Sequence, residues 1–374
     1  MNQGCSKGNK IIGNPDMPDD ILVDILIRLP TKSLLRFKCV CKSWCSLIQD
    51  QTFIDTHCDH RGHEANKKNT NFRLMELCSS GFQFHSVDQR AGISTQIGPS
   101  NRLYSSIGFS HPYTPSCNGL FCFLAWTNDL IVCNPMTNEN VTLPRPTFLE
   151  GMQSSEKRLV RIGFGFDVIS KKYKVVGCTL RHYLHSPPKV EVLTLGDRSW
   201  KIVNGGIMNP SRVLDKVVCL NGVLYWLSTP GGRVIRSFDL GDEKFGVLST
   251  PPSIRFSKTR HWLGDLEGCL CLIDHDNNIV DLWVLTICSD KQEWDNQRIF
   301  LPIDSRPRFY PFPVRKGEIM MQSTKATICD IYHYDQQGQV GKTIKVTGLH
   351  PFMFLVGIYD DTLVTLKNLY VMQN

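Results

Sequence analysis

The stretch that decides the fold of this chain occupies residues 17–48 and reads MPDDILVDILIRLPTKSLLRFKCVCKSWCSLI. In its first half, apolar residues recur at the helical positions 21, 22, 25, 26 and 29. Two aspartates stand in the first turn, where negative charge interacts favourably with the helix dipole. Pro30 removes a backbone donor and ends this helix, and Thr31 is expected to cap a second one.

The chain up to residue 57 predicts further short helices. A third helix carries one apolar face, formed by Val40, Trp44, Leu47 and Ile48. Asp50 or Thr52 is expected to start a short fourth helical turn. About forty residues in short helices cannot enclose so many large apolar side chains, because so small a unit has much surface for its volume. These side chains therefore either dock on the rest of the chain or form a surface for a partner, and composition favours neither.

This stretch resembles the F-box of plant F-box proteins that carry a C-terminal F-box-associated, kelch-like region, similar to the S-locus F-box-like group. The segments that carry the resemblance are Pro18–Leu22, Ile25–Pro30, Lys32–Val40 and Lys42–Trp44. Met17 replaces the usual leucine and Cys41 the common serine, and both changes keep an apolar or small side chain.

The resemblance implies a function for each part of the chain. Residues 16–57 would be an F-box that binds the Skp-type adaptor of a cullin-RING ubiquitin ligase, and the remainder would select a protein substrate. Such a chain is a substrate receptor of an SCF-type ligase rather than an enzyme, and it needs no cofactor. The residues that the resemblance implies for adaptor binding are Pro18, Ile21, Leu22, Ile25, Leu26, Leu29, Pro30, Leu34, Leu35, Val40, Trp44, Leu47 and Ile48.

Beyond a polar connector at residues 58–71, the pattern changes to short β-type runs separated by turns. A glycine precedes a predicted strand at positions 119, 222, 268 and 317, and the last two intervals are 46 and 49 residues. The first interval, 103 residues, leaves room for one more unit, which begins with the GFGFD strand at residues 163–167. A period of about 45 to 50 residues with several strands per copy indicates a β-propeller.

The predicted fold class is therefore α+β multidomain, with a small all-α module followed by an all-β propeller of about six blades at residues 72–374. Seven blades and a pair of β-sandwiches are the alternatives. Residues 352–356 and 362–366 are expected to be strands that return to the first blade and close the ring. The Asn134-Pro135 pair and the GFGFD strand extend the family resemblance over this region, and residues 1–15 are expected to be disordered.

Composition limits the class of protein. A hydrophobic content of 41% excludes disorder throughout, and no apolar stretch approaches the ~18 residues that cross a membrane. With no secretory signal either, we expect no membrane partner and a cytoplasmic or nuclear location, or both. The 15 cysteines form no CxxC motif and are expected to be free thiols. The net charge of +7 is spread along the chain, so no nucleic-acid partner is expected.

Motifs for chemistry are few. The GCSKG run at residues 4–8 matches a nucleophile pattern but lacks the flanking strand and helix that such a site requires. A second candidate is a metal-like spacing of His57, Cys58, His60 and His63. No second ligand cluster follows at a zinc-motif distance, so no metal is expected. Cys269 and Cys271 alternate along a strand and are expected to share one buried face.

Substrate binding is expected in the loops of the propeller, because blades are constrained by packing whereas connections vary freely. One candidate loop, residues 179–189, contains Arg181, His182 and Tyr183, and a second, residues 255–262, contains Arg260, His261 and Trp262. Two alternatives stay open. One is an enzyme with an active site in the propeller channel, for which no cluster of histidines and carboxylates stands out, and the other is an F-box protein in a complex without ligase activity.

Overall fold

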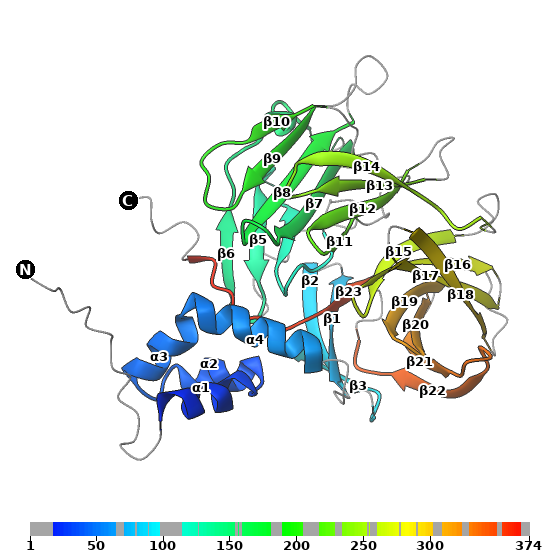
Figure 1. Cartoon of the computed structure of the whole chain (residues 1–374), viewed down its shortest axis with the longest axis horizontal. Helices are drawn as coiled ribbons and strands as arrows, with labels where there is room; N and C mark the ends of the chain where they lie inside the picture. The colour runs from blue at the N-terminus through cyan, green and yellow to red at the C-terminus, as the bar shows by residue number, and fades with distance from the viewer. Residues whose placement is uncertain are drawn as a thin grey trace, which may run out of the picture. The chain divides into compact units, whose positions relative to one another are not determined.

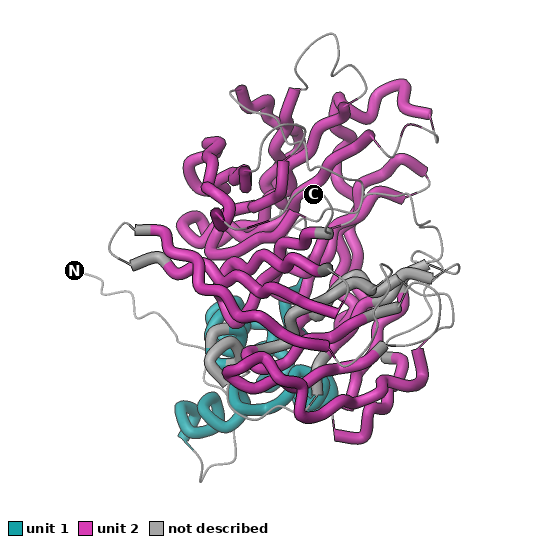
Figure 2. The backbone as a smooth tube through the Cα atoms, turned by 90° about the vertical axis from the view of Figure 1, so that its right-hand side faces the viewer, with its two compact units in different colours: residues 1–69, 361–365 teal, residues 70–360, 366–374 magenta. Residues whose placement is uncertain are grey.

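The computed structural model describes residues 18–64, 71–78, 81–88, 90–97, 114–125, 127–153, 156, 159–180, 189–204, 217–228, 234–252, 254, 260–276, 278–288, 291–301, 309–323, 329–349 and 354–367. It divides into two compact units (Figure 2), one formed by Met1–Asn69 with Asp361–Thr365 and the other by Thr70–Asp360 with Leu366–Asn374. The first unit contains the four α-helices of the described residues and the second the strands (Figure 1). No helix among the described residues is long and apolar enough to cross a membrane.

The helical unit contains the predicted helices. They are α1 (Asp19–Ile27), α2 (Thr31–Phe37), α3 (Lys42–Gln49) and α4 (Gln51–Glu64). Pro18 and Pro30 directly precede α1 and α2 with φ of −59°, a position where a missing N–H removes no helical hydrogen bond. The carboxylate of Asp50 accepts a hydrogen bond of 3.1 Å from the Phe53 N–H and so caps α4, as predicted.

Three local predictions for these helices are wrong. Val40 does not lie on the third helix, because α3 begins at Lys42. Thr31 does not cap α2 but is its first residue, and its hydroxyl donates instead to the carbonyl oxygen of Asp361 at 3.4 Å. The fourth helix is not a short turn, because α4 has 14 residues and continues through Glu64, well into the predicted connector. Phe53, Ile54 and His57 in its first half are buried, and packing of this kind stabilises a helix that a polar sequence alone does not predict.

The strand unit contains six antiparallel sheets within the described residues. Each corresponds to one blade of a propeller, and we number the blades along the chain. Blade 1 has β1 (Asn71–Cys78), β2 (Gly81–Asp88), β3 (Ile93–Ile97) and β23 (Phe354–Tyr359); blade 2 has β4 (Phe121–Leu124), β5 (Leu130–Asn134) and β6 (Glu139–Thr142), followed by the 3-10 helix η2 (Thr147–Leu149). Blade 3 has β7 (Val160–Asp167), β8 (Lys172–Thr179), β9 (Val190–Thr194) and β10 (Lys201–Val203); blade 4 has β11 (Val218–Leu220), β12 (Val223–Ser228), β13 (Val234–Asp239) and β14 (Lys244–Ser249). Blade 5 has β15 (Arg260–Leu266), β16 (Cys269–Asp276), β17 (Ile279–Cys288) and β18 (Lys291–Phe300); blade 6 has β19 (Phe309–Arg315), β20 (Glu318–Ser323), β21 (Cys329–Tyr334) and β22 (Val340–Val346).

The recurring glycines of the sequence occupy equivalent turns. Gly119, Gly222, Gly268 and Gly317 all have φ between 78° and 83°. The residue before three of them also has positive φ, 47° at position 118, 50° at 221 and 51° at 267. Two successive positive φ values are typical of a type I′ turn, whose twist matches that of the two strands it joins. In blades 4, 5 and 6 the glycine lies in the hairpin between the first two strands, and Gly119 lies in a similar turn before β4, between the bridged residues Cys117 and Leu120. The predicted repeat is therefore confirmed.

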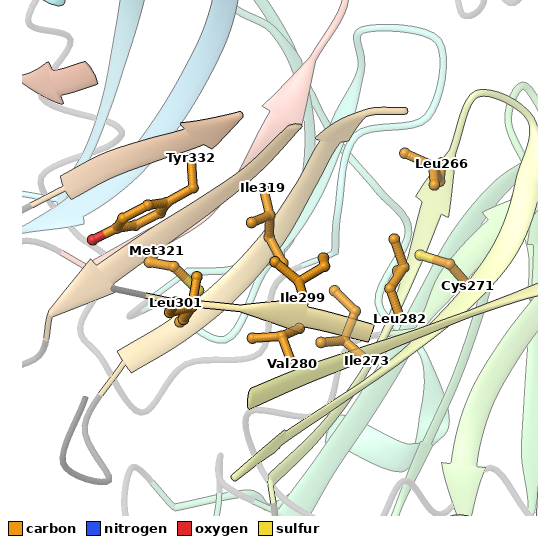
Figure 3. Packing of buried hydrophobic residues seen from close by; sticks show 10 residues of the cluster. All are labelled: Leu266, Cys271, Ile273, Val280, Leu282, Ile299, Leu301, Ile319, Met321 and Tyr332. Carbon is orange, nitrogen blue, oxygen red and sulfur yellow. The ribbon is translucent and has the colours of Figure 1, made fainter. Parts of the chain in front are cut away.

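The blades pack on one another in chain order. Among their first strands, β4 contacts β7, β7 contacts β11, β11 contacts β15, and β15 contacts β19. Figure 3 shows the apolar cluster between blades 5 and 6, formed by Leu266, Cys271, Ile273, Val280, Leu282, Ile299, Leu301, Ile319, Met321 and Tyr332. A further cluster joins Leu74 and Val87 of blade 1 to Met320 and Ile331 of blade 6. Blade 6 thus packs on blade 1, which confirms a closed propeller and rules out a pair of sandwiches.

The C-terminal strand completes the first blade. Strand β23 pairs antiparallel with β1, from Arg73 opposite Tyr359 to Leu77 opposite Phe354, as predicted for the strand near residues 352–356. The second strand predicted there, at residues 362–366, is absent. Residues 361–365 group with the helical unit instead, where Asp361 accepts a hydrogen bond from Thr31 and Thr362 lies beside Cys58.

Hydrogen bonds also join consecutive blades at their outer strands. The Trp200 indole donates to the carbonyl of Pro144 at 2.7 Å, and the Trp294 indole donates to that of Ser249 at 3.1 Å. The same kind of link uses the backbone between blades 5 and 6, where the Phe300 N–H donates to Gly338 at 2.9 Å. Between blades 6 and 1, the N–H of Thr347 donates to Gly92 at 2.8 Å. These links join blade 2 to 3, 4 to 5, 5 to 6 and 6 to 1 outside the apolar core.

Candidate partner-binding site

Three large apolar side chains of the helical unit are exposed to solvent. The exposed fraction is 52% for Ile21, 44% for Ile25 and 61% for Val40. Ile21 and Ile25 lie one turn apart on α1 and therefore share a face, while Val40 lies in the connection between α2 and α3. Apolar surface gains roughly 25 cal/mol per Å² when it leaves water, so these side chains are candidates for contact with a protein partner.

Four residues predicted to bind a partner lie in the core instead. Leu22, Leu26, Leu34 and Ile48 are all buried. Successive residues of an α-helix are rotated by about 100° about its axis. Positions 22 and 26 of α1 therefore face the core when positions 21 and 25 face solvent. Their side chains lie in the core of the folded unit and support the exposed residues beside them. Their contact with a partner stays a prediction.

The other predicted residues lie between these extremes. Pro18 and Pro30 are exposed, and Leu29, Leu35, Trp44 and Leu47 are partly buried. The Trp44 ring meets the ring of Phe37 edge to face, with 5.4 Å between the centroids and 62° between the planes. This contact joins α3 to α2 and orients the indole at the surface. Phe37 was not predicted for the site, because its helical position does not distinguish it from its apolar neighbours.

Cys41 caps the third helix at this surface. Its sulfur accepts a hydrogen bond from the Trp44 N–H at 3.5 Å and lies 3.1 Å from the Ser43 hydroxyl. Hydrogen bonds from Ser43 and from the Trp44 N–H lower the pKa of the Cys41 thiol below its usual value. Cysteine at this position therefore does the capping that a serine would do, and it keeps the start of α3 in place.

Two family models match this arrangement of helices and blades. The F-box domain matches residues 15–56, and the F-box associated beta propeller domain matches residues 74–367. The chain belongs to the F-box proteins with this propeller domain. The helical unit is accordingly its F-box, and the resemblance to plant F-box proteins is confirmed.

Relatives in Arabidopsis thaliana cover most of the chain. One F-box protein is 26% identical and covers 97% of this chain and 93% of its own. A second is 29% identical and covers 82% of each, and a third, 30% identical, covers 79% of this chain and 71% of its own. Solved structures are more distant. The periplasmic gluconolactonase of Pseudomonas aeruginosa is 13% identical over 77% of this chain and 99% of its own, and its TM-score of 0.39 is too low to support an argument.

The residues predicted for substrate binding are not brought together in the described part of the propeller. Arg181, His182 and Tyr183 lie outside the described residues. Arg260, His261 and Trp262 do not belong to a loop, because β15 begins at Arg260 and pairs with β16. The His261 side chain is largely buried, with its Nε2 atom 3.6 Å from Asp274 Oδ1. The sequence predicts a loop here because residues typical of turns continue up to the start of β15.

The candidate metal ligands and the paired cysteines of the sequence have structural surroundings. No group of three or more His, Cys, Asp or Glu side chains with metal-binding geometry occurs in the described ranges. The Nε2 atom of His57 lies 3.0 Å from the carbonyl oxygen of Leu29, so this buried ring joins α4 to the end of α1. Cys271 is buried as predicted, but Cys269 is exposed, because it directly follows the turn where the sheet reaches solvent.

Proposed function

We propose that this F-box protein is the substrate receptor of an SCF-type ubiquitin ligase. Its F-box binds a Skp-type adaptor, the adaptor connects it to the cullin, and its propeller captures a protein substrate for ubiquitination. In this proposal the chain has no catalytic role, cofactor, membrane or nucleic-acid partner of its own, and it acts in the cytoplasm, the nucleus or both.

The exposed apolar side chains of the F-box support this proposal most directly. Ile21, Ile25 and Val40 stand in water on a unit whose family model is the F-box domain. Large apolar groups that a partner desolvates usually contribute most of the binding energy of an interface. Trp44, partly buried and held by Phe37, adds a rigid aromatic side chain in the same unit.

Charged substitutions at the exposed positions test adaptor binding. We expect Ile25→Glu and Val40→Glu each to lower the affinity for a purified Skp-type adaptor at least tenfold, about 1.4 kcal/mol, in isothermal titration. Because both side chains are exposed, the thermal unfolding midpoint should hardly change. Ile169→Glu is the matched control, since this isoleucine is 79% exposed in the turn after β7 and lies outside the F-box.

Other outcomes would count against parts of the proposal. If the unaltered chain does not bind the adaptor, or if Ile169→Glu weakens binding as much as Val40→Glu, the proposed adaptor surface is wrong. Reconstitution with the cullin and its RING subunit then tests the ligase role. Adaptor binding without ubiquitin transfer to any captured protein would favour an F-box complex without ligase activity.

A further inference from the structure

Five residues near the C-terminus are part of the F-box unit. Asp361–Thr365 group with the N-terminal helices rather than with the propeller strands that precede them in the chain (Figure 2). Four of the five are buried, and Thr362 and Leu363 are at most 1% exposed. We call residues 361–365 the C-terminal strap. A segment buried to this degree contributes to the core of the unit that it joins.

The strap contacts two helices of the F-box. The hydroxyl of Thr31, the first residue of α2, donates to the carbonyl oxygen of Asp361 at 3.4 Å. The sulfur of Cys58 in α4 lies 3.8 Å from the hydroxyl oxygen of Thr362. Thr31 is itself fully buried, so its hydroxyl would lose its acceptor if the strap were absent. The strap is therefore a buried segment that accepts a hydrogen bond from α2 and contacts α4.

Both ends of the strap continue into the propeller. Before it, β23 pairs with β1 and completes blade 1. After it, the N–H of Leu366 donates to the Glu139 carboxylate of β6 at 2.7 Å, within blade 2. The chain thus leaves the propeller after Asp360 and returns to it at Leu366. The strap is covalently continuous with the strand that closes the ring.

We propose that the F-box reaches its adaptor-binding state only when the strap is in place, so that a chain must complete its propeller before it can join the ligase. This inference rests on the proposed adaptor function. Four short helices make a marginal unit, because a small domain buries a low fraction of its surface. The strap and β23 follow the other propeller strands in the chain, and the F-box therefore stays incomplete until these two segments have been synthesised.

The test compares strap variants of the full chain with matched propeller variants. Leu363→Ala removes a fully buried strap side chain, and Leu193→Ala removes an equally buried leucine from β9. A third variant replaces residues 361–365 by glycine and serine, and a chain that ends at Lys367 serves as its control. Two readouts are used: affinity for a purified Skp-type adaptor, and hydrogen exchange of the amides in α2, α4, β1 and β23.

We expect Leu363→Ala and the glycine-serine variant to lower adaptor affinity at least about tenfold, because the binding-competent fraction of the F-box falls. Amide exchange should accelerate in α2 and α4 and stay unchanged in β1 and β23. Leu193→Ala and the chain ending at Lys367 should keep the affinity and the exchange rates of α2 and α4.

Two results would overturn the inference. One is unchanged adaptor affinity together with unchanged exchange in α2 and α4 when the strap is replaced. The other is an equal loss of affinity in Leu363→Ala and Leu193→Ala, which would indicate a general loss of stability. If the unaltered chain binds no Skp-type adaptor, the proposed function fails, and the exchange rates of α2 and α4 still decide whether the strap completes the helical unit.

Discussion

At the scale of residues, Lys174 shows how the propeller tolerates buried charge. Its Nζ atom lies 3.2 Å from Asp167 Oδ2 and 3.3 Å from Glu243 Oε1, and it donates a hydrogen bond to the carbonyl of Leu240. Asp167 and Lys174 belong to blade 3, whereas Leu240 and Glu243 belong to the β13–β14 turn of blade 4. A buried cation with several partners is stable only while all of them stay in place, so this group fixes the two blades relative to each other.

Removal of this cation should be costly. We expect Lys174→Met to lower the free energy of unfolding by about 3 kcal/mol, because it leaves the buried Asp167 carboxylate without its cation, while the partly buried Glu243 still pairs with Lys201 at 2.6 Å. Lys244→Met is the control, since Lys244 pairs with Asp242 at 3.3 Å on the surface, and exposed pairs contribute at most about 1 kcal/mol. Urea unfolding of both variants measures the difference, and equal losses would show that the Lys174 group is not special.

Asp167 should make stability depend on acid pH. Burial alone would raise the pKa of this carboxyl, but hydrogen bonds from Ser170, from the Ile169 N–H and from Lys174 outweigh it and lower the pKa from 3.8 to about 2. A group with a lowered folded pKa stabilises the protein fully above its unfolded pKa and loses that contribution as the pH falls towards the folded value. The urea midpoint should therefore drop between pH 4 and pH 2, and Asp167→Asn should reduce this dependence. An identical slope in the variant would exclude Asp167 as its source.

At the scale of elements, turns control both the shape of a blade and its contact with the next. Gly268, in the β15–β16 turn, has φ of 83°, and a Cβ atom there would meet no atom within 4 Å. Gly338, in the β21–β22 turn, has φ of 76°, and a Cβ atom there would stand 1.7 Å from the carbonyl oxygen of Arg298 in blade 5. Glycine is needed at position 268 only for the positive φ. At position 338 it is also needed because the backbones of two blades approach each other closely.

Alanine at these two glycines separates the two effects. We expect Gly268→Ala to cost about 1 kcal/mol, because an L-residue is strained in the left-handed region. Gly338→Ala should cost about 3 kcal/mol, since the methyl group must also push two backbones apart and weaken the Phe300–Gly338 hydrogen bond. The free energies of unfolding in urea give both values. Equal costs would mean that the backbone of blade 5 near Arg298 shifts away from the added methyl group at little cost.

At the scale of the whole molecule, the ring is closed by β23, the last strand among the described residues. Strand β23 covers the edge of β1. The apolar cluster between blades 6 and 1 buries further side chains where the first and the sixth blade meet. A propeller without this strand would expose the edge of β1, and exposed edges recruit other chains.

Truncation should reveal this closure. A chain that ends at residue 353 lacks β23, and we expect it to elute as aggregates in size-exclusion chromatography and to lose its cooperative melting transition. A chain that ends at Lys367 keeps β23 and the strap and should elute as the full chain does. A monomeric, stable protein ending at residue 353 would contradict closure by this strand.

Much of the fold was predictable from local sequence patterns. The apolar period and the prolines predicted α1 and α2, and the glycines at 119, 222, 268 and 317 predicted equivalent hairpins. Both features depend on interactions between residues close in sequence, which a linear pattern records. The polar half of α4 and the strand start at Arg260 were missed, because packing by distant residues decides them.

The sequence by itself determined the class of each unit, the repeat of the blades and the family. Only the tertiary structure decided which apolar side chains of the F-box are exposed. Ile21 and Leu22 are neighbours on α1, and the core decides which of them faces inward. The tertiary structure also decided the place of residues 361–365, whose extended apolar pattern fits a strand equally well. Burial against helices from the other end of the chain is a long-range contact, and no local pattern encodes it.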